Sequence, residues 1–199
     1  MDLLIGTSNP GKLREITAYL SGLDLRFLSL RDVDLESLDI DEPFATFEEN
    51  AEHKARAYAG ASGLAALADD TGLVVDALGG RPGVYSARYA SGADENRYLK
   101  LLGELEGVPD DRRTARFVCA MAVVDPHSNT VETRRGKVEG RIARSPGSGA
   151  EGFGYDAVFI PDGYSVTLAE IPLIEKSGIS HRGDALRQLI PVLERWSHG

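Results

Sequence analysis

The order of apolar runs, turns and amphipathic segments predicts an α/β fold for this chain. Residues 3–5 are a short apolar run that leads through a turn into a helical pattern. Residues 46–60 carry a second helical pattern, which is followed by an apolar strand at 64–68. Residues 115–124 and 130–142 form a predicted antiparallel pair of strands. Strands and helices that mix in this way indicate an α/β architecture.

A polar turn links the first strand to the first helix and consists of Thr7, Ser8, Asn9, Pro10, Gly11 and Lys12. Asparagine suits a helix N-cap, proline suits the first helical position, and glycine lets a ligand approach the backbone. Two hydroxyl groups, amide hydrogens at a helix start and a lysine together suit a polyphosphate. Taken alone, the six residues are more often a capped helix with a surface lysine.

The second helix begins with a capping-box pattern over residues 46–49, and its apolar residues share one face up to Gly60. Glu42 lies just before this helix and could supply a carboxylate from a separate segment. Lys54 could reach a phosphate, but a solvated lysine balanced by neighbouring acidic residues is the simpler interpretation.

Two adjacent carboxylates, Asp69 and Asp70, are predicted where the strand at 64–68 gives way to a turn, before another strand begins at Leu73. Side chains alternate along a strand, so the two should point to opposite sides, one toward a site and one toward structure. Magnesium prefers one or two carboxylates together with waters and substrate phosphates. By themselves, two aspartates in a turn are more often a solvated cap.

The second half of the chain has more loops. Glycine and proline punctuate a predicted loop at 79–89, and the antiparallel pair turns near residues 125–128. The remaining predicted elements are a helix at 94–102, a loop at 145–154, a strand at 157–160 and a helix at 180–190 that Pro191 interrupts or kinks.

Two segments of this half could recognise a flat base. Residues 152–156, Gly-Phe-Gly-Tyr-Asp, combine aromatic rings with an acid, and residues 180–183, Ser-His-Arg-Gly, start a helix with two donors. An aromatic strand start and a capped helix with solvated basic residues are the alternative interpretations. Lys176 is similarly ambiguous.

Composition limits the function further. The 199 residues favour one large domain or two tightly packed lobes, and no apolar run approaches the roughly 20 residues that span a bilayer. A net charge of −9 argues against a broad electrostatic grip on DNA or RNA. Cys119, the single cysteine, lies in a predicted buried strand. The N-terminus lacks signal-peptide features, so we expect a cytoplasmic protein that contacts neither nucleic acid nor membrane.

Seven motifs, taken in order, resemble the inosine/xanthosine triphosphate pyrophosphatase family, also called the Ham1 family. The resemblance covers nearly the whole chain, and seven motifs in this order and approximate spacing are highly specific. They lie at residues 7–12 (TSNPGK), 46–51 (TFEENA), 69–73 (DDTGL), 79–83 (GGRPG), 152–156 (GFGYD), 175–176 (EK) and 180–183 (SHRG).

The resemblance implies a single domain over residues 1–199, with an elongated two-lobed α/β architecture and a central mixed β-sheet flanked by helices. It also implies an active-site cleft between the lobes and a homodimer. Mg²⁺ would be held by Glu42 and Asp70, with Asp70 as the catalytic proton acceptor. The triphosphate would contact residues 7–12 and Lys176, and Thr71 would make a further substrate contact. The base would be enclosed by Phe153, Gly154, Tyr155, Asp156, His181 and Arg182.

The implied reaction is hydrolysis of ITP, dITP or XTP to the monophosphate and pyrophosphate. Hypoxanthine and xanthine carry an oxygen at C6 where adenine has an amino group, so donors from His181 or Arg182 would be unpaired by ATP. A site built on such hydrogen bonds can reject the wrong base by roughly 10⁴–10⁵. Guanine also carries this oxygen, so the argument does not exclude GTP.

Three departures from the family pattern affect local loops: Pro43-Phe44 after Glu42, Ala157-Val158 after Asp156, and Ser177 where asparagine is common. Two alternative functions are a pyrophosphatase for modified pyrimidine nucleotides and a nucleotide sensor without turnover. The residues at 153–156 and 180–182 disfavour the first alternative. A sensor has no need for a water-activating carboxylate, which disfavours the second.

Overall fold

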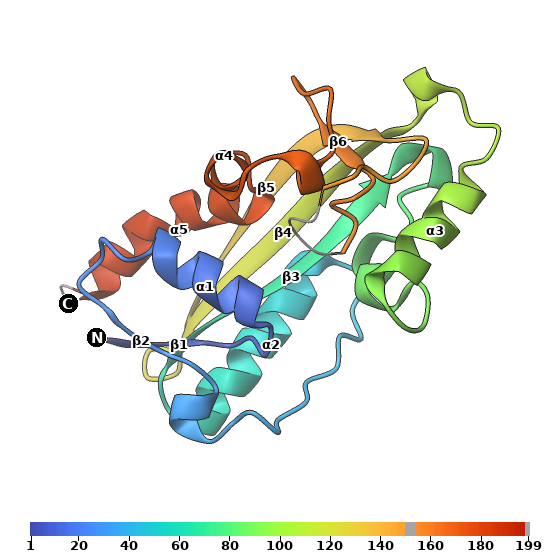
Figure 1. Ribbon diagram of the computed structural model, residues 1–199. Coiled ribbons are helices and arrows are strands. Elements are labelled where there is room, and N and C mark those ends of the chain that lie inside the picture. Colours follow the sequence, from blue (N-terminus) through green and yellow to red (C-terminus); the bar gives the residue numbers. More distant parts are fainter. Residues whose placement is uncertain (150–153, 198–199) are drawn as a thin grey trace. The chain divides into compact units, whose positions relative to one another are not determined.

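A computed structural model describes residues 1–149 and 154–197 and contains a mixed six-stranded sheet flanked by helices (Figure 1). The strand order is β2-β1-β3-β4-β5-β6. Helices and strands mix along the chain, so the predicted α/β class is confirmed. The strands are β1 (Asp2–Ile5), β2 (Arg26–Leu28), β3 (Ala65–Val75), β4 (Thr114–Asp125), β5 (Thr130–Ile142) and β6 (Phe159–Pro161).

The helices occupy most of the segments for which a helical pattern was predicted. They are α1 (Pro10–Tyr19), α2 (Phe47–Ser62), α3 (Asp94–Glu104), α4 (Leu173–Gly178) and α5 (His181–Ser197). Short 3-10 turns lie between them, and the one that matters below is Gly83–Arg88. In the part of the chain that the structure describes, no helix has both the length and the apolar character needed to cross a bilayer.

The chain divides into two compact units, each assembled from separate stretches of sequence. The first unit comprises residues 1–70, 119–136 and 182–199, and the second comprises residues 71–118 and 137–181. Strands β3, β4 and β5 each contribute residues to both units. Asp69 and Asp70 are therefore the last residues of the first stretch of the first unit.

The first unit is built on the parallel start of the sheet. β1 pairs in parallel with both β2 and β3, and Ile5 lies opposite Leu67. The chain then turns at Gly6, whose amide donates to the Leu67 carbonyl at 2.7 Å. A Cβ atom on Gly6 would lie 2.4 Å from the Tyr58 ring, so only glycine fits this turn without a shift.

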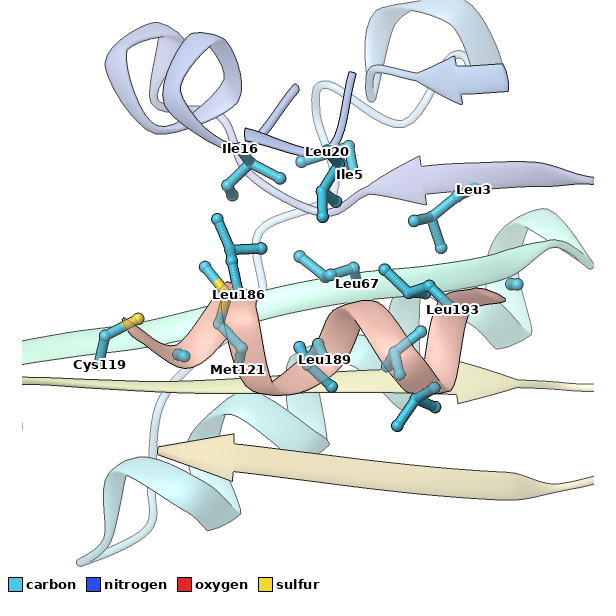
Figure 2. Packing of buried hydrophobic residues seen from close by; sticks show 14 residues of the cluster. Leu3, Ile5, Ile16, Leu20, Leu67, Cys119, Met121, Leu186, Leu189 and Leu193 are labelled. Atoms are coloured by element: carbon cyan, nitrogen blue, oxygen red, sulfur yellow. The ribbon is translucent and has the colours of Figure 1, made fainter. Parts of the chain in front are cut away.

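One apolar cluster fills the first unit on the side of α1 and α5 (Figure 2). Burial of these side chains provides the main favourable free energy of folding here, at roughly 25 cal/mol for each Å² of apolar surface. Cys119 is one of the buried members, as the sequence predicted. The labelled residues in the figure are Leu3, Ile5, Ile16, Leu20, Leu67, Cys119, Met121, Leu186, Leu189 and Leu193.

The second unit has its own apolar cluster. Leu73 and Val75 of β3 pack there with Leu101 of α3 and with the aromatic rings of Phe117 and Phe159. The two rings meet edge to face, with centroids 4.8 Å apart, a favoured geometry for aromatic pairs. Burial of Leu73 and Val75 in this cluster favours the extended conformation of residues 71–75.

The structure corrects two of the predicted boundaries. The predicted turn at residues 69–72 is wrong, because β3 runs unbroken from Ala65 to Val75. The prediction that Pro191 interrupts the helix is wrong as well, since α5 continues through it to Ser197, whereas a kink at Pro191 stays a prediction. In both cases buried apolar residues on either side, such as Leu189 and Val192 in α5, outweigh the local turn or proline signal.

Candidate active site

The turn after β1 has the predicted cap. Asn9 Oδ1 accepts hydrogen bonds from the amides of Gly11 (2.8 Å) and Lys12 (3.1 Å), and Pro10 is the first helical residue. The Asn9 amide in turn donates to Thr7 Oγ1. The prediction that the helix start offers free amides is therefore wrong for Gly11 and Lys12, because the cap already satisfies them. These two amides are therefore already occupied by the cap.

Asp69 faces the α1 and α5 side of the sheet, the same side as Leu67. Lys12 Nζ lies 2.8 Å from Asp69 Oδ2, and the Asp69 side chain is only 2% exposed. Burial alone would raise the pKa of Asp69, but Lys12, Arg182 and Lys54 outweigh it and hold the pKa well below its ordinary value. Asp69 is thus an ionised carboxylate that holds Lys12 in place.

Asp70 meets a different set of partners, because the next side chain along a strand points to the opposite face. Asn50 of α2 donates to Asp70 Oδ2 at 3.0 Å. Burial raises the pKa of Asp70 to about 6, and Glu42 and Asp69 add to the rise, while Lys54 and the Asn50 hydrogen bond oppose it. The prediction that the two aspartates point to opposite sides agrees with these separate partners.

Both aspartates lie beyond the carboxyl end of β1. The ladder between β1 and β3 ends with Ile5 opposite Leu67 and the Gly6 amide on the Leu67 carbonyl. Asp69 and Asp70 follow two and three residues later along β3. The two carboxylates therefore lie just past the end of β1 but in the middle of β3.

Lys54 differs from the predicted solvated lysine. Its ammonium group pairs with the Glu42 carboxylate, and its side chain is only 12% exposed. Burial would lower the pKa of Lys54, but Asp69, Glu42 and Asp70 outweigh this and raise the pKa above its ordinary value. Lys54 therefore remains charged and joins the segment that carries Glu42 to helix α2. The sequence offered one signal for this position, which is the spacing of four residues between Asn50 and Lys54 that places both on one face of the helix.

Arg182 completes the charge cluster of the first unit. Its Nη1 pairs with Glu15 of α1, and its Nε lies 3.9 Å from Asp69 Oδ2. The side chain is 2% exposed, and its Nε and Nη2 atoms form no hydrogen bond with the residues that the structure describes. Sequence reasoning missed Glu15, whose proximity to Arg182 depends on the packing of α1 beside α5. The predicted contact of Arg182 with a base stays a prediction.

The remaining predicted site residues lie in the second unit. Lys176 Nζ is 2.6 Å from Asp156 Oδ2, and the Gly154 amide donates to Asp94. Tyr155 is buried, and its hydroxyl donates to the Ser86 carbonyl.

Within the same unit, the His181 ring stacks on Phe117 with centroids 4.9 Å apart. Thr71 lies in β3, next to Asp70 along the chain. Phe153 lies outside the described residues. The substrate contacts assigned to these residues stay predictions.

Residues 3–192 match the model of the Ham1 family. The chain belongs to the Ham1 family. Among Ham1 relatives, proteins named dITP/XTP pyrophosphatase from Symbiobacterium thermophilum and Bacillus subtilis are 48% and 46% identical to it. These alignments cover 96% and 97% of this chain and 94% and 97% of the relatives.

Solved Ham1 structures have the same fold. A HAM1 protein from Coxiella burnetii matches with a TM-score of 0.89 and 40% identity, covering 98% of this chain and 99% of the other. A nucleoside-triphosphatase, also titled dITP/XTP pyrophosphatase, from Mycobacterium abscessus matches with a TM-score of 0.79 and 44% identity. That match covers 96% of this chain and all of the other.

The raised pKa of Asp70 predicts a pH-dependent effect of the Asp70→Asn substitution. A folded-state pKa of about 6, above the ordinary 3.8, means that the folded protein binds this proton more tightly than the unfolded chain. The resulting stability is present below about pH 4 and is lost as the pH rises through about 6. In metal-free buffer, Asp70→Asn should therefore raise the free energy of unfolding at neutral pH by up to about 3 kcal/mol, and by little near pH 4.

Urea unfolding in the presence of EDTA at both pH values measures this difference. Asp125→Asn is a control of opposite sign, because the hydrogen bond from Ser128 lowers the pKa of Asp125. That substitution should reduce stability at neutral pH. Equal destabilisation by Asp70→Asn at both pH values would contradict the assignment.

Proposed function

We propose that this protein hydrolyses the non-standard purine nucleoside triphosphates ITP, dITP and XTP to the monophosphate and pyrophosphate. The observation that carries the proposal is the buried charge cluster of the first unit, where Asp70 has a pKa of about 6 beside Glu42 and Lys54. The membership of the chain in the Ham1 family and its relatives named dITP/XTP pyrophosphatase support this choice of substrate.

Mg²⁺ is the proposed metal, and Glu42 and Asp70 would hold it. Among the described residues, no three or more His, Cys, Asp or Glu side chains are grouped to hold a metal. Two carboxylates nonetheless fit Mg²⁺, which keeps several waters and takes further oxygen ligands from substrate phosphates. Glu42 also raises the pKa of Asp70, so a divalent cation would offset the repulsion between these two carboxylates.

In the proposed reaction, the oxygen of a water molecule attacks the α-phosphorus, and the bond from this phosphorus to the bridging oxygen breaks. Pyrophosphate leaves, and Asp70 accepts the proton of the attacking water. A base with a pKa of about 6 is well matched to proton transfer near neutral pH. When bound, Mg²⁺ would polarise phosphate oxygens and offset charge on the departing pyrophosphate.

The proposed substrate contacts follow the family resemblance. Residues 7–12, Thr71 and Lys176 would hold the phosphates, with Lys12 kept in position by Asp69. The base would contact the residues assigned to it above: Phe153, Gly154, Tyr155, Asp156, His181 and Arg182.

Arg182 gives the proposed base preference a physical basis. Its Nε and Nη2 atoms are buried without a hydrogen bond to the described residues. Leaving a buried donor unsatisfied costs about 1–3 kcal/mol. A base oxygen at C6 would satisfy such a donor, whereas the C6 amino group of adenine would not.

We also propose, from the family resemblance, a cytoplasmic homodimer in which residues 1–199 act as one catalytic domain.

Pyrophosphate release from ITP, dITP, XTP, GTP, ATP and dTTP, with and without Mg²⁺, tests the proposed activity. We expect metal-dependent turnover of ITP, dITP and XTP, and much weaker turnover of ATP, because the buried donors find no acceptor at its C6 position. In ¹⁸O-labelled water the label should enter the monophosphate, because water attacks the α-phosphorus. Absence of metal-dependent turnover of ITP, dITP and XTP would refute the function.

Asp70→Asn tests the role of the proposed base. General-base help is typically worth 10²–10⁴-fold, so kcat for ITP should fall by at least about 100-fold. Binding of a non-hydrolysable α,β-methylene analogue of ITP, measured without Mg²⁺, should change little, since Lys12 and the other phosphate contacts remain. Equilibrium titration and steady-state kinetics measure the two quantities, and Asp125→Asn serves as the charge-matched control. Unchanged kcat in Asp70→Asn would remove Asp70 from this role.

A further inference from the structure

Asn50 is a fully buried polar residue at the end of the first turn of α2. Its Oδ1 atom accepts a hydrogen bond from the Phe44 amide at 2.9 Å. Its Nδ2 atom donates to the Phe44 carbonyl at 3.3 Å and to Asp70 Oδ2 at 3.0 Å. One side chain thus joins a loop, a helix and the strand that carries the proposed base.

These contacts fix the orientation of the Asn50 amide. The Phe44 amide can only donate, so it must face Oδ1, and the opposite amide orientation would place NH₂ against this donor. That orientation would also place Oδ1 against the Phe44 carbonyl and the Asp70 carboxylate. Because a buried polar group without a partner is costly, the side chain has one satisfied orientation. Asp70 Oδ2 is then committed to Asn50.

The loop that Asn50 holds is the one that carries Glu42. Residues 38–43 have no helix or strand structure, so their position depends on side-chain contacts. Asn50 binds the backbone of Phe44. Lys54 lies one helical turn further along α2 and pairs with the carboxylate of Glu42, which is two residues before Phe44 in the chain. Two neighbouring positions of one helix therefore hold this loop.

The third hydrogen bond of Asn50 goes to the proposed base and not to the loop. The two contacts with Phe44 already satisfy Oδ1 and one N–H of Asn50. The second N–H is directed at Asp70 instead. Asparagine is also a poorer helix former than alanine or leucine, so this residue type is not explained by the helix alone.

We propose that Asn50 is a positioning residue for the reaction, which orients the carboxylate of Asp70 and sets the position of the loop that carries Glu42. The inference rests on the proposed hydrolysis of ITP. With Oδ2 held by Asn50, Oδ1 is the oxygen of Asp70 that would accept the proton of the attacking water. Small misplacements in an active site are expensive, since about 1 Å can cost roughly 100-fold in rate.

Asn50→Asp and Asn50→Ala separate the two jobs of this side chain. Asn50→Asp has nearly the same shape and keeps an acceptor for the Phe44 amide, but it loses the donors to the Phe44 carbonyl and to Asp70. We expect kcat for ITP to fall at least about tenfold in both variants, while KM changes less than about threefold, because the phosphate contacts are untouched. Ser62→Ala is the matched control, since it removes a side-chain hydrogen bond at the other end of the same helix.

The KM-against-kcat split distinguishes positioning from a general loss of stability, and all assays are run below the unfolding transition of each variant. A kcat within about twofold of wild type in folded Asn50→Asp, or a change no larger than that of Ser62→Ala, would overturn the proposal. Wild-type protein with no turnover of ITP would instead refute the proposed function.

Hydrogen exchange of the wild-type Phe44 amide tests the loop contact without any substitution. We expect this amide to be protected although it lies outside helices and strands, and to remain protected in Asn50→Asp but not in Asn50→Ala. Exchange of the wild-type amide at the rate of an unstructured chain would overturn the proposal even if neither variant folds.

Discussion

Side-chain alternation along β3 is the constraint on which the proposed active site depends. Because the strand continues through Asp69 and Asp70, the two carboxylates must leave it on opposite faces. Asp69 meets Lys12 and Arg182, whereas Asp70 meets Asn50. Two chemically identical neighbours thereby acquire pKa values displaced in opposite directions. One is a fixed counter-ion for a lysine, and the other has the properties of a base.

Charge balance explains why the first unit tolerates so many carboxylates. The cluster contains four carboxylates, Glu15, Glu42, Asp69 and Asp70, and three cations, Lys12, Lys54 and Arg182. Buried charges of this kind persist only when they are paired. The imbalance falls on Asp70, which has Asn50 as its hydrogen-bond partner and a pKa raised to about 6.

Local signals in the sequence predicted the helices that begin with a capping side chain. Asn9 and Pro10 mark the start of α1, and Thr46 marks the start of α2, as their side chains require. The turn predicted at residues 69–72 failed because burial of Leu73 and Val75 outweighs the preference of Asp and Gly for turns. The short strand β2 went unpredicted because three residues show no useful alternation.

The site was harder to predict than the fold for a physical reason. Motifs singled out Lys12 and Asp70, but the partners that set their charge states come from distant segments. Lys54 resembles any solvated helical lysine until the loop that carries Glu42 folds back onto α2. The partners of Arg182 likewise depend on helix α1, far away in sequence. Such pairings depend on tertiary packing, which periodicity and spacing do not contain.

The most direct test of this account is a pH titration of the side-chain carboxyl carbons of Asp69 and Asp70, followed by ¹³C NMR in metal-free protein. We expect Asp70 to titrate near pH 6, while Asp69 stays ionised down to the lowest pH at which the protein remains folded. Two carboxyls that titrate together near their ordinary value of 3.8 would contradict it.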